Sequence, residues 1–125
     1  MMGTLFGATE YVKVRVNPAT LDVENGTPAA FTVNVGAQKG IHVNAQPSPT
    51  IKSETKGAEL SITSLPKNGD YLDLGKPIEV RCNVKGFSPG IHTVRFEMRF
   101  TFCSDTEGWC SMGTDSSSIQ IRVTK

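Results

Sequence analysis

The sequence lacks a surplus of charge of either sign. Its 125 residues include 13 lysines and arginines and 12 acidic residues, so the formal net charge is +1. Proteins that bind nucleic acids present a basic stripe, commonly with aromatic side chains between the basic ones. Aromatic residues make up only 7% of this chain, and no such stripe occurs. We therefore expect no nucleic-acid partner.

Long apolar runs are also missing. A membrane-spanning helix needs about 20 consecutive apolar residues, and no segment approaches this length. We expect no direct membrane insertion of this chain. The first residues, MMGTLFGATEY, are too short and too uncharged for a signal peptide. We expect residues 1–9 to be a flexible or added start that stands in place of a natural leader.

No stretch has the 3.6-residue apolar period of an amphipathic helix. The sequence also lacks an internal repeat, a domain linker and a low-complexity tract. These absences and the chain length predict a single domain over residues 1–125, large enough to bury a core.

Alternation of apolar and polar residues is the main pattern that is present. This period of two is typical of half-buried strands, and Gly, Pro and Asn separate the runs. Strands are expected at residues 11–16, 31–35, 41–45, 60–63, 78–84, 93–103 and 118–123. The segment 115–118 is interpreted as a polar connection. The pattern predicts the all-β class, as an immunoglobulin-like antiparallel β-sandwich, with a small barrel as the alternative.

The alternation separates the three cysteines. Cys82 is in phase with Ile78 and Val80, so we expect a buried and slowly reacting thiol. Cys103 ends a run whose phenylalanines lie on the opposite face, which places it away from the main core. Cys110 follows after an acidic loop. If the chain reverses in that loop, the two sulfurs meet across a hairpin, where a disulfide is possible.

Three interpretations of this pair stay open from the residues alone. A local staple would contribute only about 2–3 kcal/mol, because the loop is short. An exposed pair could instead exchange electrons with another protein. The third is a copper(I) or zinc site, for which soft ligands are available. Its candidate ligands are Cys103, Cys110, Met112 and either His42 or His92. The spacing matches no standard metal motif, so we expect no metal site.

Three stretches carry a resemblance to a known family: NVGAQKGIHVNAQPSP, GKPIEVRCNV and GIHTVRFEMRFTFCSDTEGWC. Together they resemble the amino-terminal periplasmic domain of DsbD-type thiol:disulfide interchange proteins, also called the disulfide-bond-corrector domain. The resemblance covers most of the chain from Phe31 onward. His42 stands where the family has a tyrosine, and Ser111-Met112-Gly113 replaces an aromatic-proline sequence.

The resemblance implies an immunoglobulin-like sandwich in which Cys103 and Cys110 cycle between dithiol and disulfide without a cofactor. It implies a thiol:disulfide oxidoreductase component in the periplasm, or otherwise exported. Electrons would come from a thioredoxin-like or membrane-embedded donor and pass to oxidised proteins. A cap over the pair would correspond to residues 66–76, with Tyr71 and Leu72 as covering side chains. His42 is a further candidate for cap or partner contact.

Two roles remain open for Trp109, which follows the acidic loop. It could shield the sulfur or contact a partner, or it could pack on the sandwich. By position, Cys110 is favoured for contact with partners and Cys103 for resolving the mixed disulfide. The alternative to redox activity is a binding or structural module with an inert hairpin disulfide. A copper-binding module is the weakest alternative.

Overall fold

The computed structural model describes residues 11–124, so the expectation for residues 1–9 lies outside the described part of the chain. The described residues form strands and no helical element. None of them belongs to a helix long and apolar enough to cross a membrane. The strands are β1 (Val12–Asn17), β2 (Thr20–Glu24), β3 (Ala29–Ala37), β4 (Ile41–Val43), β5 (Thr50–Ser53), β6 (Ala58–Ser64), β7 (Lys67–Asn68), β8 (Tyr71–Leu72), β9 (Ile78–Val84), β10 (Gly90–Ser104) and β11 (Cys110–Thr124).

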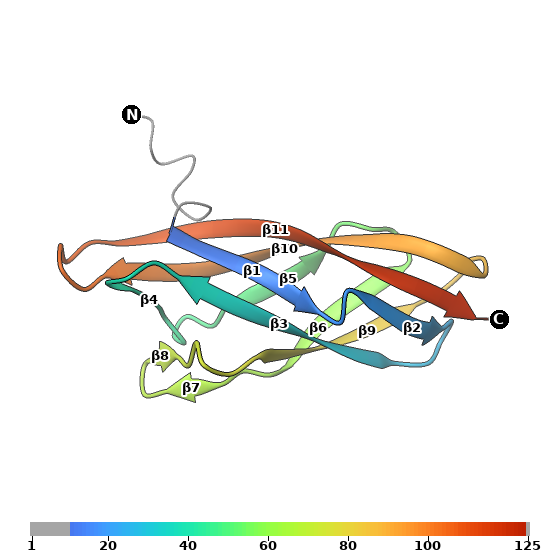
Figure 1. Cartoon of the computed structure of the whole chain (residues 1–125), viewed down its shortest axis with the longest axis horizontal. Helices are drawn as coiled ribbons and strands as arrows, with labels where there is room; N and C mark the ends of the chain where they lie inside the picture. The colour runs from blue at the N-terminus through green and yellow to red at the C-terminus, as the bar shows by residue number, and fades with distance from the viewer. Residues whose placement is uncertain (1–10, 125) are drawn as a thin grey trace, which may run out of the picture.

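These strands build two sheets that pack face to face (Figure 1). One sheet has the order β1-β3-β9-β6, and the other has the order β2-β11-β10-β4 with β5 also paired to β10. The ladders are antiparallel apart from β2 with β11, which is parallel. The strands β7 and β8 form a separate small hairpin. The expected two-sheet sandwich is confirmed, whereas the alternative of a closed barrel is not observed.

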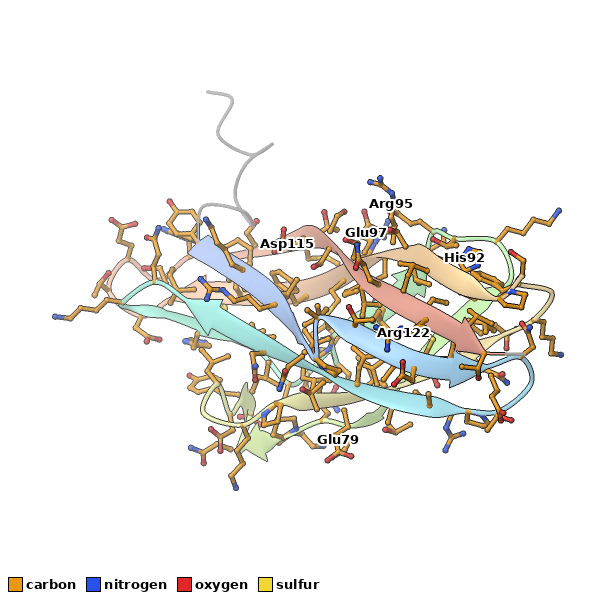
Figure 2. All side chains as sticks on the ribbon, turned by 45° about the vertical axis from the view of Figure 1, so that its right-hand side comes forward. Glu79, His92, Arg95, Glu97, Asp115 and Arg122 are labelled. Carbon is orange, nitrogen blue, oxygen red and sulfur yellow. A yellow bond between two sulfur atoms is a disulfide. The ribbon has the colours of Figure 1, made fainter. Side chains whose placement is uncertain are left out.

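The core lies between the inward faces of the two sheets. Phe31 of β3 and Phe96 of β10 meet across it, with ring centroids 6.1 Å apart. Burying a side chain of this kind contributes about 1.5–3 kcal/mol relative to leaving it exposed. Charged residues occupy the outer faces: Arg95 and Glu97 project from one sheet and Glu79 from the other (Figure 2). Where a strand has an apolar phase, as in β3, β9 and β10, that phase points inward, as the alternation predicted.

The structure corrects several strand boundaries. The predicted strand at residues 78–84 is confirmed as β9, but β2, β5 and the β7–β8 hairpin were not predicted. The segment 115–118 is not a connection, because it lies inside β11. Its backbone continues an unbroken register with β10 from the pair Cys103–Cys110 to the pair Gly90–Val123. Backbone pairing with a long neighbour therefore makes a strand of residues that show no apolar alternation.

The two sheets are also joined along one side. The chain runs through β1 in the first sheet and then, after Pro18, through β2 in the second. The backbone N–H of Val14 in β1 donates to Oδ2 of Asp115 in β11, at 2.9 Å. Figure 2 shows Asp115 on β11 near the middle of the molecule. This hydrogen bond closes the side of the sandwich where β1 lies against β11.

One end of the sandwich carries the predicted site. The β10–β11 turn, β4 and the β7–β8 hairpin all lie at the left-hand end in Figure 1. Asn44, just after β4, forms a bridge with Tyr71 of β8. The N–H of Ala45 donates to the carbonyl of Asp70, at 2.8 Å. These backbone contacts hold the small hairpin against the sheet end where the two cysteines lie.

Candidate functional site

The two cysteines stand directly opposite each other at the turn end of the β10–β11 hairpin. Cys103 in β10 and Cys110 in β11 are register partners, with Cα atoms 4.0 Å apart, and their sulfurs form a disulfide. The hairpin that the sequence suggested is therefore confirmed, and so is the pairing of these two residues. Residues facing each other across an antiparallel ladder share one face of the sheet. Both sulfurs lie on the outer face, opposite the buried phenylalanines.

The turn between the cysteines is held by hydrogen bonds from Ser104. Its N–H donates to the carbonyl of Trp109 at 2.8 Å, and its carbonyl accepts from the N–H of Gly108 at 3.0 Å. Its hydroxyl accepts the N–H of Glu107 at 3.1 Å. Gly108 has φ of 77°, a left-handed conformation that a residue without Cβ adopts at low cost. The local sequence thus builds a tight turn that brings Cys110 back to Cys103.

Access to the two halves of the disulfide is unequal. Cys103 is 6% exposed although it is not part of the hydrophobic core cluster, whereas Cys110 is exposed. The difference arises because Cys103 lies between two strands and Cys110 lies on the side away from β4. An incoming thiolate therefore has a more open approach to the sulfur of Cys110 than to that of Cys103.

His42 lies beside the disulfide on the neighbouring strand. The register of β4 with β10 places His42 opposite Cys103, so the order across the sheet is His42, Cys103, Cys110. The Nδ1 atom of His42 is 2.5 Å from Oδ1 of Asp105, which is the first residue of the turn after β10. The ring of Tyr71 covers the imidazole, with centroids 3.8 Å apart. A second polar side chain, that of Asn44, places Oδ1 3.7 Å from Sγ of Cys103.

These groups surround an open hollow of about 550 Å³ at the sheet end. Its lining includes four residues that the sequence had singled out, namely His42, Tyr71, Cys103 and Cys110. Asn44, Gln46, Asp70, Ser104, Asp105 and Gly108 complete it. The side chain of Tyr71 is 47% exposed and lies at its edge. The arrangement leaves Cys110 accessible, whereas Cys103 is covered and lies beside a partly covered imidazole.

Leu72 and Trp109 are both packed against the sandwich. Leu72 is buried in the hydrophobic core cluster, whereas Tyr71, the other expected covering residue, lines the hollow. Neighbouring residues of a strand point to opposite sides, which separates Leu72 from Tyr71. Trp109 packs edge-on against Tyr11 and Phe102, with centroids 5.3 and 5.9 Å apart. Of its two predicted roles, the structure supports packing on the sandwich.

No group of three or more His, Cys, Asp or Glu side chains within residues 11–124 is arranged to hold a metal ion. Met112 is 72% exposed on β11. His92 lies at the other end of β10, where a ring nitrogen is 2.7 Å from the carbonyl of Ser88 and the ring packs against Phe87. His92 is thus partly buried and hydrogen-bonded, and it is no part of the cysteine site.

The roles of Asp105 and Asn44 were not predicted from the sequence. Asp105 belongs to the acidic loop between the cysteines, and its carboxylate holds His42, which is 63 positions earlier in the chain. A signal for Asn44 was present, because alternation places it on the same strand face as His42. No local pattern could connect Asp105 to His42, since their contact depends on which strands become neighbours.

The remaining cysteine and the largest hollow lie away from this site. Burial of Cys82 raises the pKa of its thiol, because desolvation disfavours the thiolate. This agrees with the expected buried, slowly reacting residue. A hollow of about 860 Å³ lies over β1 and β3, lined by Lys13, Arg15 and Asn34 among others. The described residues that line it include no cysteine or histidine, so we place the candidate chemistry at the smaller hollow.

Comparison with known proteins supports the fold. No protein-family signature matches the sequence, and no curated protein matches it. Among solved structures, murine CRIg is 8% identical, with a TM-score of 0.51, covering 92% of this chain and 99% of that one. AggA, the major subunit of aggregative adherence fimbriae type I from Escherichia coli, is 16% identical, with a TM-score of 0.43 and coverages of 90% and 94%.

A third similar structure is the BIgI domain of the beta protein from S. agalactiae, solved bound to CEACAM1. It is 13% identical, with a TM-score of 0.38, and covers 90% of this chain and 96% of that domain. Identities this low bear on the fold alone. The chain is an immunoglobulin-like β-sandwich with a disulfide between Cys103 and Cys110 at one end of its long hairpin.

Proposed function

We propose that this chain is a thiol:disulfide exchange domain that passes electrons through the Cys103–Cys110 pair. One observation carries the proposal: the disulfide lines an open hollow with Cys110 exposed and Cys103 almost fully covered. Exchange needs one sulfur that a partner can attack and another close by to resolve the intermediate. The unequal exposure of two bonded sulfurs supplies both conditions.

In the proposed reaction, a thiolate of a reduced partner attacks Sγ of Cys110. A bond forms between the partner's sulfur and Sγ of Cys110, and the electron pair of the broken disulfide passes to Sγ of Cys103. The partner's second cysteine, as a thiolate, then attacks the sulfur of the partner's first cysteine in the mixed disulfide. A disulfide forms within the partner, and Cys110 is released as a thiolate. Two electrons and two protons have entered the domain, which returns them to an oxidised protein by the reverse steps.

The partner class and the compartment follow from the resemblance to DsbD-type proteins. A thioredoxin-fold protein or a membrane-embedded donor supplies the dithiol, and an oxidised exported protein accepts the electrons. A persistent disulfide is typical of oxidising compartments, which supports a periplasmic or otherwise exported location.

Trapping with single-cysteine variants tests the exchange. The probe is a thioredoxin that keeps only its attacking cysteine, activated as a mixed disulfide with thionitrobenzoate. We expect Cys103→Ser, which leaves Cys110 free, to form a stable mixed disulfide with this probe. The matched variant Cys110→Ser should react much more slowly, because its remaining site thiol is covered. Equal slow reaction of both variants would remove the basis of the proposal.

A redox titration gives an independent measurement. Trp109 is the only tryptophan, and it lies next to Cys110, so its fluorescence can report the state of the pair. Exchange proteins have potentials of about −120 to −270 mV, whereas inert structural disulfides lie below about −300 mV. We expect a value in the first range. A value well below −300 mV would favour the inert module.

That inert module is the second candidate function, and one observation favours it. The packing of Trp109 against Tyr11 and Phe102 secures the hairpin end to the sandwich. In a binding or structural module, the disulfide would only add to this anchoring. Replacing both site cysteines would then lower stability and leave partner binding intact.

A further inference from the structure

The position of His42 beside the disulfide is fixed by backbone pairing. His42 and Cys103 are register partners in adjacent antiparallel strands. Side chains at such positions share a face, and their Cβ atoms are about 4.5–5.5 Å apart. Both residues line the same hollow as Cys110. An imidazole therefore stands next to the covered sulfur, on the side opposite Cys110.

The orientation of this imidazole is fixed from two further directions. Asp105 accepts at Nδ1, with Nδ1 and Oδ1 2.5 Å apart, and Tyr71 stacks on the ring. Asp105 is itself anchored, because its backbone N–H donates to the carbonyl of Gly40 at 2.7 Å. A neutral histidine whose Nδ1–H is donated to a carboxylate keeps its lone pair on Nε2. The nitrogen that remains for chemistry is therefore Nε2.

We propose that His42 is the general base for Cys103 and that Asp105 is its positioning residue. The inference rests on the proposed exchange function and names the group that activates the resolving cysteine. A nucleophile, a base beside it and a third group that orients the base recur where sulfur or oxygen nucleophiles are activated. Here the activated sulfur is the covered one, not the one that meets the partner.

The step balances within the domain. When Cys110 is joined to a substrate sulfur, the Cys103 thiol gives its proton to Nε2 of His42. The resulting thiolate attacks Sγ of Cys110, the new disulfide forms, and the substrate leaves as a thiolate. The imidazolium then releases the proton to the departing thiolate or to water. When a partner reduces the domain and Cys103 leaves as a thiolate, the same imidazolium returns a proton to Cys103.

The charges around the hollow make this role specific to His42. The ionisable groups facing it are Asp105 from the β10–β11 turn, Asp70 from the small hairpin and the phenol of Tyr71. No lysine or arginine occurs among the described residues that line it. A developing thiolate on Cys103 therefore faces carboxylates, and the proton taken up by His42 supplies the compensating positive charge. Asn44 adds only a neutral amide near the sulfur.

The test uses the full chain with glutathione as the partner sulfur. Reduced protein is mixed with excess oxidised glutathione, quenched in acid at intervals, and analysed by mass spectrometry. The measured quantity is the first-order rate at which the Cys110–glutathione adduct converts to the internal disulfide. The variants are His42→Phe, which keeps a ring under Tyr71, and Asp105→Asn. His92→Phe replaces the other histidine, which lies at the end of β10 far from Cys103, and is the matched control.

At pH 7 we expect His42→Phe to slow the conversion by about 100-fold, the low end of general-base effects. Asp105→Asn should slow it by a smaller factor, and His92→Phe should leave it unchanged. In His42→Phe the rate should climb about tenfold per pH unit, because hydroxide must then generate the thiolate. The wild-type rate should depend less steeply on pH, because the base is then supplied within the domain. A purely structural role would lower the rate without changing this pH profile.

Each outcome decides the question. Adducts that form and convert at wild-type rate in both His42→Phe and Asp105→Asn would overturn the inference while leaving exchange intact. If wild-type protein forms no Cys110 adduct and no mixed disulfide with thioredoxin, the proposed function itself fails. Should His42→Phe not fold, Asp105→Asn still decides, because that carboxylate is largely exposed in the turn.

Discussion

At the scale of single residues, the three cysteines have three different environments. Cys82 is buried in the core between β3 and β6, Cys103 is covered at the sheet end, and Cys110 is exposed. Alternation along the strands was enough to place Cys82 and Cys103 on opposite kinds of face. It could not predict the depth of Cys103, because the residues that cover it come from other parts of the chain.

The buried thiol of Cys82 predicts a pH dependence of stability. Its pKa is raised in the folded state, whereas an unfolded cysteine has a pKa of about 8.5. Below pH 8.5 both states hold the proton, and stability is unaffected. As the pH rises above this value, only the unfolded chain releases the proton, so the free energy of unfolding falls, by at most about 1.4 kcal/mol per pH unit.

Urea unfolding at several pH values between 7 and 10 measures this effect. Cys82→Ala is the reference, because other groups titrate equally in both proteins. We expect the difference in unfolding free energy between wild type and variant to shrink as the pH rises. A difference that stays constant across this range would show that Cys82 does not carry the dependence.

At the scale of elements, the long β10–β11 hairpin explains which predictions succeeded. The alternation from Val94 to Phe102 identified β10 because one face is buried and the other is solvated. The first half of β11 is rich in serine, threonine and glycine and has no apolar face. It forms a strand because its backbone pairs continuously with β10 and because Asp115 accepts a hydrogen bond from β1. Neither contact can be predicted from the residues of this segment alone.

The disulfide at the hairpin end is expected to stabilise the fold without being required for it. Its cysteines are 7 positions apart, and closing so short a loop is worth about 2–3 kcal/mol. The double variant Cys103→Ala/Cys110→Ala should therefore lower the free energy of urea unfolding by this amount and keep one cooperative transition. Loss of that transition would show that the disulfide is required for the fold.

Asp115 should contribute more to the free energy of unfolding than an ordinary surface carboxylate does. Its Oδ2 accepts the Val14 N–H, and a hydrogen bond to a charged acceptor is worth about 1.5–3 kcal/mol. We expect Asp115→Ala to lower the free energy of unfolding by about this amount, and Asp115→Asn to lower it less. Denaturant unfolding of each variant provides the measurement.

Asp22 is the matched control for Asp115. It pairs with Arg122 at 3.0 Å, but its side chain is 71% exposed, so water already screens the pair. We expect Asp22→Ala to change stability by less than about 1 kcal/mol. Equal losses of unfolding free energy in Asp22→Ala and Asp115→Ala would mean that the hydrogen bond to β1 stabilises the fold no more than an exposed ion pair does.

At the scale of the whole molecule, the sandwich separates the core from the candidate site. The core is filled from both sheets, whereas the disulfide, His42 and Asp105 lie outside it at one end. The sequence predicted the two packed sheets because the alternation of apolar and polar residues marks the inward face of the longer strands. The neighbours of the cysteines were not predictable, because they depend on β4 lying beside β10 and on the small hairpin lying against β4.

This separation predicts that reduction of the disulfide changes the molecule locally. In nuclear magnetic resonance spectra of oxidised and reduced protein, amide signals should shift for residues around the hollow, such as His42, Tyr71 and Asp105. Signals from the opposite end, such as His92 and the Ser88–Gly90 turn, should stay in place. Shifts spread over both ends would indicate that the redox state alters the packing of the two sheets.

The parallel pairing of β2 with β11 has a mechanical consequence. The chain enters β2 at one end of this ladder and leaves β11 at the other, with Thr20–Glu24 in register with Gln120–Thr124. Tension applied through the two ends of the chain would pull these strands past each other along their length. All the hydrogen bonds of the ladder would then bear the force together, so the domain is built to resist stretching between its ends.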